Sequence, residues 1–541
     1  MQRTPRALSG AAILLTIACC FAHGQSFDSS SGPGSRTGPP TADDMLKKVD
    51  LLVQQNEQLE KQNHELMDQI SAMRRMLAEQ AHAPQADALE SAIAKEASPG
   101  ESRPSPNPNS PTTATPVESS ASISNSSVIA KTQTTDAVAG QEQSRTWGNY
   151  TPNFGYKVAN TEFGDMSISL YSYVRYLNQK NLAPTYTNYF GVTSTLQQRQ
   201  DVQINKVQIK FLGWMLNPKL RYFLYAWTSN ASQGLGAQVV LAGNLSYKFN
   251  NYFTLAGGIR SLPGTRSVEG NFPFWLGVDT RLITDEFFRP SYTSGIWATG
   301  DLSKTLSYQA MVGNNLSTLG VSAAQIDNAF NTVSSMLAWE PTTGEFGIGF
   351  GDFENHQKLA TRIAGHYTTS TETAQEQPGT DAFENTQIRL SDGSVVFTPN
   401  LFRPGTTVES LRYQMVSGDG GFKYHGWAFE AEGFWRWLNN FEGTGTAGLP
   451  TRYDTGYQFQ LSMMPIQKKL QLYSGGSHIF GQYGNPYDAR IGTNWFPYKN
   501  RVLRWNTELL YLFRSPVGYT SVPFPLGGKG LVFHTNVELA F

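Results

Sequence analysis

The stretch "FHTNVELAF", Phe533–Phe541, ends the sequence and alternates between two kinds of side chain. Every second position belongs to one set, which consists of Phe533, Thr535, Val537, Leu539 and Phe541. The residues between them are small, charged or polar. A period of two is that of a β-strand with two different faces. Such a strand can pack on the core of a soluble protein, or it can face lipid in a membrane barrel. The rest of the chain has to distinguish these two cases.

The composition limits the possible classes of protein. Of the 541 residues only 16% are charged, and beyond the N-terminus no run of 18 apolar residues predicts a transmembrane helix. The 42 basic and 43 acidic side chains exclude a strongly basic nucleic-acid-binding protein. Residues 1–150 carry 12 basic and 16 acidic side chains, whereas residues 151–541 carry 30 and 27, so the C-terminal part is slightly basic.

The first 24 residues have the pattern of an export signal. Two arginines precede the apolar stretch Ala11–Phe21, and the small residues Ala22–Gly24 suit cleavage before residue 25. Both cysteines, Cys19 and Cys20, lie inside this signal, so the exported chain could form no disulfide. Lipoprotein processing at one of them is a weaker alternative, because the residues before them lack the expected leucine.

Three segments follow before the C-terminal part. Residues 25–44 are predicted to be flexible, and residues 45–77 to form an α-helical coiled coil, because apolar residues recur every seven positions without Gly or Pro. Asn56 and Asn63 in its seam suit self-association better than a solitary helix; the peptide rules favour two strands, which a larger assembly can override. Residues 78–149, rich in Ser, Thr and Pro, are predicted to be a disordered linker.

Residues 150–541 contain a long series of alternating segments. "KVQIKF" sets Val207, Ile209 and Phe211 against two lysines, and "GWAFEAEGFWRW" (426–437) sets aromatic residues against charged ones. "MSISLYSYVRY" (166–176) and "VLRWNTELLYLF" (502–513) alternate in the same way. One face of each predicted strand is therefore apolar and the other polar, as in a sandwich or a membrane barrel.

The spacing of the turns favours the barrel. Long polar connections are expected at Thr228–Ala237, Ser261–Phe272 and Ser370–Pro404, and seven short turns alternate with such loops. Those short turns are expected at Asn217-Pro218, Asn250-Asn251, Asp301–Lys304, Pro341–Gly344, Asp419–Gly421, Pro465–Lys468 and Pro497–Asn500. Seven turns with both ends on the same side predict an all-β fold, a 16-stranded antiparallel transmembrane β-barrel, which leaves no unpaired strand edge in lipid.

Several segments resemble the phosphate-selective porin O and P family. They are "LAGGIRSLPG", "DEFFRPSYTSGIWATGDLSKTLSYQAMVGNN", "TNWFPYKNRVLRWNTELLYLF" and the first predicted hairpin, together with the preceding coiled coil. The resemblance covers about residues 166–541. It implies a trimeric outer-membrane porin of Gram-negative bacteria with a basic, anion-selective lumen. It also implies that Phe541, with Leu539 and Val537, forms the signal recognised by the barrel-assembly machinery.

If the apolar faces meet lipid, the charged side chains of the strands line the interior. A structural ion pair or a rim charge is an equally good interpretation of any one of them. The candidates are Arg175, Lys206, Lys210, Arg221, Arg362, Arg412, Glu430, Glu432, Arg436, Arg504 and Glu508. Ser370–Pro404, the longest connection, is a candidate for a constriction inside the barrel or for an extracellular flap.

The sequence favours a passive channel over an enzyme. The five histidines of the barrel region are scattered without metal-ligand spacing, so no catalytic residue, metal or cofactor is expected. The predicted function is diffusion of small hydrophilic anionic or neutral solutes through the outer membrane, with a weak preference for anions and phosphate as a candidate. The coiled coil would lie in the periplasm and hold a homo-oligomer together. A closed barrel serving as a coiled-coil-stalked tether or adhesin is the first alternative, and a barrel-embedded hydrolase the second.

Overall fold

The structure, a computed structural model, describes residues 150–151, 155–228, 239–269, 274–319, 321, 325–326, 330–378, 387–518 and 522–541. The predicted signal peptide (1–24), flexible segment (25–44), coiled coil (45–77) and linker (78–149) lie outside these residues. In this part of the chain no helix has the length and the apolar character to cross a membrane.

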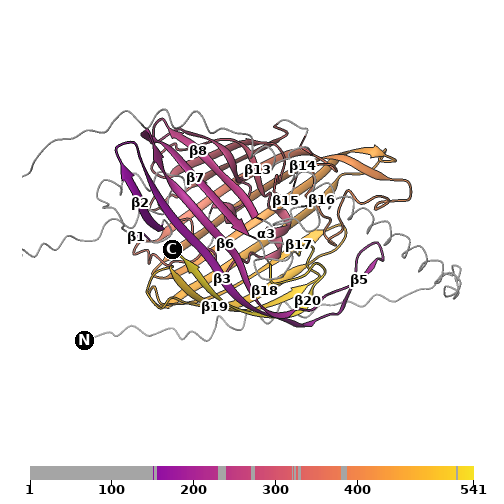
Figure 1. Ribbon diagram of the computed structural model, residues 1–541. Coiled ribbons are helices and arrows are strands. Elements are labelled where there is room, and N and C mark those ends of the chain that lie inside the picture. Colours follow the sequence, from indigo (N-terminus) through magenta and orange to yellow (C-terminus); the bar gives the residue numbers. More distant parts are fainter. Residues whose placement is uncertain are drawn as a thin grey trace, which may run out of the picture. The chain divides into compact units, whose positions relative to one another are not determined.

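Sixteen antiparallel strands of the described chain pair in sequence order and form a closed barrel (Figure 1). They are β3 (Gly164–Leu182), β6 (Gln200–Met215), β7 (Asn217–Thr228), β8 (Val239–Lys248), β9 (Thr254–Ser261), β10 (Tyr292–Asp301), β11 (Leu306–Gly313), β12 (Thr332–Trp339), β13 (Ala360–Thr373), β14 (Thr407–Tyr424), β15 (Trp427–Thr444), β16 (Arg452–Ile466), β17 (Leu470–Gly481), β18 (Tyr487–Trp495), β19 (Leu503–Phe513) and β20 (Lys529–Ala540). The predicted fold class and strand number are confirmed.

The last strand closes the barrel against the first. β20 pairs with β3 from Gly530 to Ala540, and the amide of Phe541 donates to the carbonyl of Leu170 at 2.9 Å. The short strand β2 (Gly155–Thr161) pairs with the beginning of β3, where Tyr156 lies opposite Ile168, and itself pairs with β1 (Tyr150–Thr151). The ring of Tyr156 meets that of Phe541 edge to face, with centroids 6.1 Å apart. The sequence stretch Phe533–Phe541 thus supplies the seam of the barrel.

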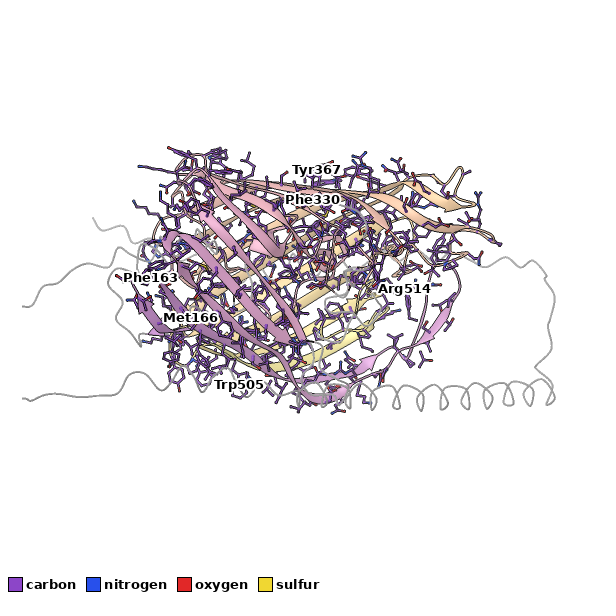
Figure 2. All side chains as sticks on the ribbon, turned by 45° about the horizontal axis from the view of Figure 1, so that its top comes forward. Phe163, Met166, Phe330, Tyr367, Trp505 and Arg514 are labelled. Atoms are coloured by element: carbon purple, nitrogen blue, oxygen red, sulfur yellow. The ribbon has the colours of Figure 1, made fainter. Side chains whose placement is uncertain are left out.

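Large apolar side chains cover the outside of the barrel, as the alternation predicted (Figure 2). Exposed aliphatic residues such as Ile363, Ile491 and Val537 lie on the outward faces of the strands. Exposed aromatic residues form two groups, here called the aromatic belts. One belt, near the short turns, includes Tyr247, Trp339, Tyr424, Trp427, Trp495 and Trp505, and the other, nearer the opposite end, includes Tyr367, Trp435, Tyr453, Phe480 and Phe533.

Most of the predicted turns join the expected strands, but two differ. Asp419–Gly421 lies inside β14, and the turn between β14 and β15 is His425-Gly426 instead. A Cβ at position 421 would lie 2.4 Å from the carbonyl oxygen of Phe429, so this glycine permits close strand pairing rather than a turn. Pro341–Gly344 only begins a long connection between β12 and β13, which runs over residues 340–359.

The connection between β9 and β10 runs through the interior of the barrel (Figure 1). Its described parts, residues 262–269 and 274–291, are called the inward segment below; they include the short helices η2 (Arg266–Glu269) and α3 (Ile283–Phe288). All six residues of α3 are buried, and α3 contacts β16, β17 and β18. Its apolar side chains explain this position, because the ring of Phe288 stacks on that of the inward Phe434 with centroids 5.2 Å apart.

The sequence predicted this connection only as a polar loop ending at Phe272, and it assigned the possible constriction to Ser370–Pro404. Residues 370–373 of that range belong to β13. Farther along it, Ile388, Leu390 and Val396 are buried in the same apolar cluster as Phe288. Two different connections therefore fill the interior from the end opposite the short turns. The β4–β5 hairpin (Thr185–Thr187 and Thr193–Thr195), which connects β3 and β6, is largely exposed and forms a sheet of its own.

Candidate functional site

The candidate site is the inner surface of the barrel. Ten of the residues predicted to line the interior lie on the inward faces of their strands, where every second residue is buried or partly buried. They are Arg175, Lys206, Lys210, Arg221, Arg362, Glu430, Glu432, Arg436, Arg504 and Glu508. Arg412 does not. It is exposed between the buried Leu411 and Tyr413, on the outward face that it shares with Val416. The assignment of Arg412 to the interior was wrong, because the apolar face of β14 is too irregular to fix its orientation from sequence.

A β-bulge in β6 orients two of these residues. The register between β3 and β6 shifts between Tyr171 and Tyr173, and Lys206 has a positive φ of 47°. Because of the extra residue, Asn205 and Lys206 are both buried, and the inward positions change from odd to even numbers. Lys210 therefore shares the inward face with Lys206, as the sequence predicted.

Most of the inward charges are neutralised by short ion pairs. Arg504 binds both carboxylate oxygens of Glu538, at 2.5 and 2.8 Å, and Arg362 binds Asp419 at 2.8 Å. These charged groups are also buried. The same holds for Arg436 with Asp454 at 2.7 Å and for Lys206 with Asp279 at 2.6 Å. Buried ions of one sign would be very unfavourable in such surroundings, so each pair compensates its own charge.

The inward arginines also bind the backbone of the inward segment. Arg175 donates to the carbonyl of Val278 at 2.8 Å, Arg504 to that of Trp275 at 2.7 Å, and Arg490 to that of Thr280 at 3.1 Å. A carbonyl of an irregular segment has no ladder partner, and burial makes an unsatisfied carbonyl costly. These guanidinium groups therefore fix the inward segment against the strand wall.

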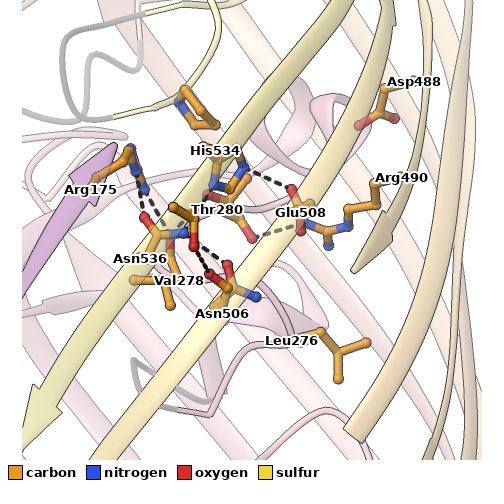
Figure 3. A network of polar contacts seen from close by, with 12 residues as sticks. Arg175, Leu276, Val278, Thr280, Asp488, Arg490, Asn506, Glu508, His534 and Asn536 are labelled. Atoms are coloured by element: carbon orange, nitrogen blue, oxygen red, sulfur yellow. Dashed lines mark hydrogen bonds and ion pairs between the residues drawn. The ribbon is translucent and has the colours of Figure 1, made fainter. Parts of the chain in front are cut away.

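A polar network connects the arginines that bind the inward segment, and it extends across β3, β18, β19 and β20 (Figure 3). Arg175 donates to Asn536 at 2.9 Å, and Asn536 donates to Asn506 at 2.8 Å. On the other side Glu508 contacts His534 at 3.1 Å and Arg490 at 3.7 Å. Glu508 is therefore part of a structural network rather than a free charge.

Glu430 and Glu432 are joined to the inward segment by Arg266. The guanidinium of Arg266 binds Glu430 at 2.9 Å, and its backbone amide donates to Glu432 at 3.1 Å. Arg266 also donates to the carbonyls of Gly347 and Ile348, which belong to the β12–β13 connection. This connection thus packs into the barrel from the end with the short turns.

The sequence interpretation missed the buried charged residues of the inward segment. They are Arg266, Asp279, Arg281, Asp285, Glu286 and Arg289. One signal was available: "RLITDEFFR" (281–289) mixes bulky apolar residues with charges, unlike the Ser- and Thr-rich loops. Bulky apolar residues in a long connection indicate that it is buried.

The inward residues along β6 to β11 are more exposed than those of the ion pairs. Lys210, Phe223, Asn244, Arg260 and Gln309 face inward and keep partial exposure, whereas the inward residues of the ion pairs described above are buried. The name "open wall" is used below for these five residues. Solvent therefore reaches the inner surface on this side.

The open wall is basic. Arg260 donates to Gln309 at 2.6 Å, and its guanidinium carbon lies 5.6 Å from the ring centre of Trp297. Among the described residues, no hydrogen bond or ion pair involves the ammonium group of Lys210. The inward faces of β7 to β11, all of whose residues are described, carry no carboxylate except Asp301 at the end of β10. Positive charge therefore predominates where solvent enters.

Comparisons with known proteins give barrels of low similarity. No family profile and no curated protein matches the chain. Among solved structures, OmpT of Vibrio cholerae is 10% identical and covers 71% of this chain and 99% of its own, with a TM-score of 0.45. The outer membrane channel DcaP of Acinetobacter baumannii is 10% identical, covers 72% and 99%, and has a TM-score of 0.42. An anion-selective porin from Comamonas acidovorans is 9% identical, covers 70% and 100%, and has a TM-score of 0.42. At these identities and TM-scores the likeness carries no information about function.

Proposed function

We propose that the protein is an outer-membrane channel through which small hydrophilic solutes diffuse passively. The observation that carries this proposal is the contrast between the two surfaces of the barrel. The outside is apolar between two aromatic belts, as expected of strands that cross a bilayer. The inside is polar and charged, and solvent reaches the open wall. A barrel of 16 strands is too wide to be filled by its own side chains alone.

The proposed passage runs along the open wall, between β6–β11 and the inward segment. Lys210 and Arg260 face this route, and a positive wall concentrates anions near it. The preference for anions is weak in this proposal, because ion pairs neutralise most other interior charges. Lys206 contributes little to it, since Asp279 binds its ammonium group at 2.6 Å. The sequence resemblance suggests phosphate as one solute to test.

The remaining sequence interpretations belong to the same proposal. The predicted coiled coil would extend into the periplasm and join subunits, with a trimer suggested by the resemblance and a dimer by the peptide rules. Outer-membrane lipid would contact the aromatic belts, and the barrel-assembly machinery would recognise the strand that ends with Val537, Leu539 and Phe541. No catalytic residue, metal or cofactor is part of the proposed mechanism.

The direct test is conductance of the purified full-length protein in planar lipid bilayers. Discrete, long-lived current steps at a constant voltage are the expected result. Solute entry into liposomes that contain the protein provides an independent measurement. Absence of both, with a barrel that is shown to be folded by its heat-modifiable migration, would exclude the channel.

One observation favours a second candidate, a closed barrel that serves as a tether or adhesin. The inward segment and the β12–β13 connection occupy the interior from opposite ends, and Arg266 joins them through the carbonyls of Gly347 and Ile348. A barrel whose interior is completely closed would give no conductance. If the inward segment closes the barrel by itself, deleting residues 345–351 of the β12–β13 connection would leave conductance absent. If these residues only narrow an open passage, the same deletion would increase the conductance.

A further inference from the structure

The outside of the barrel carries a group of positive charges at the end opposite the short turns. Lys180 lies near the end of β3, Lys529 begins β20, and Arg514 directly follows β19. The three strand ends are neighbours, because β20 pairs with both β19 and β3. All three side chains are exposed. They are called the basic patch below.

Two cations of the basic patch share one aromatic ring. The guanidinium carbon of Arg514 lies 5.7 Å from the ring centre of Phe513, and the ammonium nitrogen of Lys529 lies 5.3 Å from it. These two distances add up to 11.0 Å, which is the largest separation that the two atoms can have. Phe513 lies opposite Lys529 in the strand register and stacks on Tyr487, with ring centres 4.9 Å apart. Two exposed positive charges are therefore held close together over aromatic side chains.

These positive charges have no counter-ion among the described residues. The side chains of Arg514 and Lys529 form no hydrogen bond or ion pair there. The ammonium group of Lys180 donates to the carbonyl of Gln198 at 3.4 Å, which is neutral. An anion that binds to the basic patch would therefore not have to displace an acidic side chain.

The strands around the basic patch keep their carboxylates inside the barrel. The outward faces of β3, β18, β19 and β20, all of whose residues are described, carry no acidic residue. Their acidic residues are buried on the inward faces: Asp165, Asp488, Glu508 and Glu538. At the same end of β14 and β15, by contrast, Glu409 and Glu442 are exposed beside Arg412. Positive charge without negative charge is thus a property of this side of the barrel.

Arg514 has a backbone conformation that is unfavourable for arginine. Its φ of 55° lies in the left-handed region, which glycine or asparagine adopts at lower cost. Strict strand alternation would turn the residue after Phe513 inward, as it turns the buried Leu512. The guanidinium group of Arg514 lies instead beside the outward ring of Phe513. The unusual conformation therefore keeps a positive charge on the outside.

The basic patch lies just beyond the apolar surface of the barrel. Lys529 shares the outward face of β20 with the exposed Leu531 and Phe533, and Phe533 belongs to an aromatic belt. From Phe533 to Lys529 the strand rises about 13 Å, at about 3.3 Å per residue, which is about 10 Å along the membrane normal at a tilt of about 40°. Aromatic belts mark the boundary between acyl chains and headgroups. Lys529 therefore reaches the level of the lipid headgroups.

We propose that the basic patch binds the phosphate group of a membrane lipid. Guanidinium and ammonium groups form strong, charge-assisted hydrogen bonds with phosphate oxygens. A lipid fits better than free phosphate, because the exposed Leu531 and Phe533 lie on the same face and would contact its acyl chains. With the short turns in the periplasm, the lipid belongs to the outer leaflet. This inference rests on the proposed outer-membrane location but not on conduction.

The experiment measures lipid binding to the purified full-length protein in detergent micelles by native mass spectrometry. The probe is dioleoyl phosphatidic acid, whose headgroup is a phosphate. Dioleoyl phosphatidylcholine has the same acyl chains but a compensated charge. The double variant Arg514→Gln, Lys529→Gln should bind phosphatidic acid about 30-fold more weakly, since each cation near an anionic lipid contributes about 5-fold. Its affinity for phosphatidylcholine should stay unchanged.

Two further variants separate the basic patch from a general effect of charge. The double variant Lys468→Gln, Lys469→Gln removes two exposed positive charges from the β16–β17 turn, at the opposite end of the barrel. It should leave the tightest binding of phosphatidic acid unchanged. Lys529→Arg keeps both charges of the patch and should bind like the native protein. Heat-modifiable migration checks that each variant is folded.

Three results would overturn the proposal. They are equal affinity of the native protein and the Arg514→Gln, Lys529→Gln variant for phosphatidic acid, an equal loss in the Lys468→Gln, Lys469→Gln variant, or displacement of the lipid by an equal concentration of inorganic phosphate. If the first double variant is not folded, Lys529→Gln alone replaces it and should weaken binding about 5-fold. A barrel that binds the lipid without conducting would refute the channel only, and one that conducts without binding it would refute the basic patch only.

Discussion

Replacing Lys210 by glutamine should reduce the preference of the channel for anions. Lys210 faces inward at a partly exposed position, and no described residue pairs with its ammonium group. Its charge is therefore available to ions that pass along the open wall. Lys206, four residues earlier, is buried against Asp279 and gives a contrasting case.

The size of the effect follows from Coulomb's law with screening. An ion about 5 Å from a unit charge in water has an interaction energy of about 0.8 kcal/mol, which a Debye length of about 10 Å at 0.1 M salt reduces to about 0.5 kcal/mol. Anions gain this energy and cations lose it, so the permeability ratio changes by about 5-fold. At 1 M salt, where the Debye length is about 3 Å, the change falls below about 2-fold.

The assay is the zero-current reversal potential across a KCl gradient, at low and at high mean salt concentration. Lys469→Gln is the control, because Lys469 is exposed in the β16–β17 connection and its loss changes the net charge equally. An unchanged ratio in Lys210→Gln, an equal change in Lys469→Gln, or a native channel that prefers potassium would refute the reasoning.

Three further predictions concern assembly and stability. Arg504→Met leaves the buried carboxylate of Glu538 without its ion-pair partner, although Tyr171 still donates to it, and it should lower the free energy of unfolding by about 3 to 5 kcal/mol, measured by urea unfolding in detergent; a loss below about 1 kcal/mol would contradict the assigned pair. Phe541→Asp places a charge beside Tyr156 at the closing seam and should reduce the amount of heat-modifiable barrel in the outer membrane; unchanged assembly would argue against a role of this residue. Deleting residues 45–77 should weaken the oligomer in cross-linking experiments but preserve conductance, and loss of all conductance would show that this segment does more than associate subunits.

The sequence alone determined the barrel and the orientation of most strands. A period of two is a local property, so the alternation in Phe533–Phe541 already separates the outward Phe533 and Val537 from the inward His534 and Glu538. Apolar side chains on one face and charges on the other then decide which face can meet lipid. The turn residues predicted the strand number because turn preferences are also local, although Gly421 permits close strand pairing instead of a turn.

Only the tertiary structure decided what the inward charges do. Lys206 and Asp279 are far apart in the sequence, and no local pattern indicates that they form an ion pair at 2.6 Å. Arg175 and Arg504 also bind carbonyls of the inward segment, and no sequence pattern indicates a contact with a backbone carbonyl. The packing of the β9–β10 connection divides the interior into a region of paired charges and the open wall. Where this connection buries the inward charges, most of them form ion pairs, because an unpaired buried charge is unfavourable. Strand periodicity is thus fixed by neighbours along the chain, whereas charge pairing is fixed by neighbours in space.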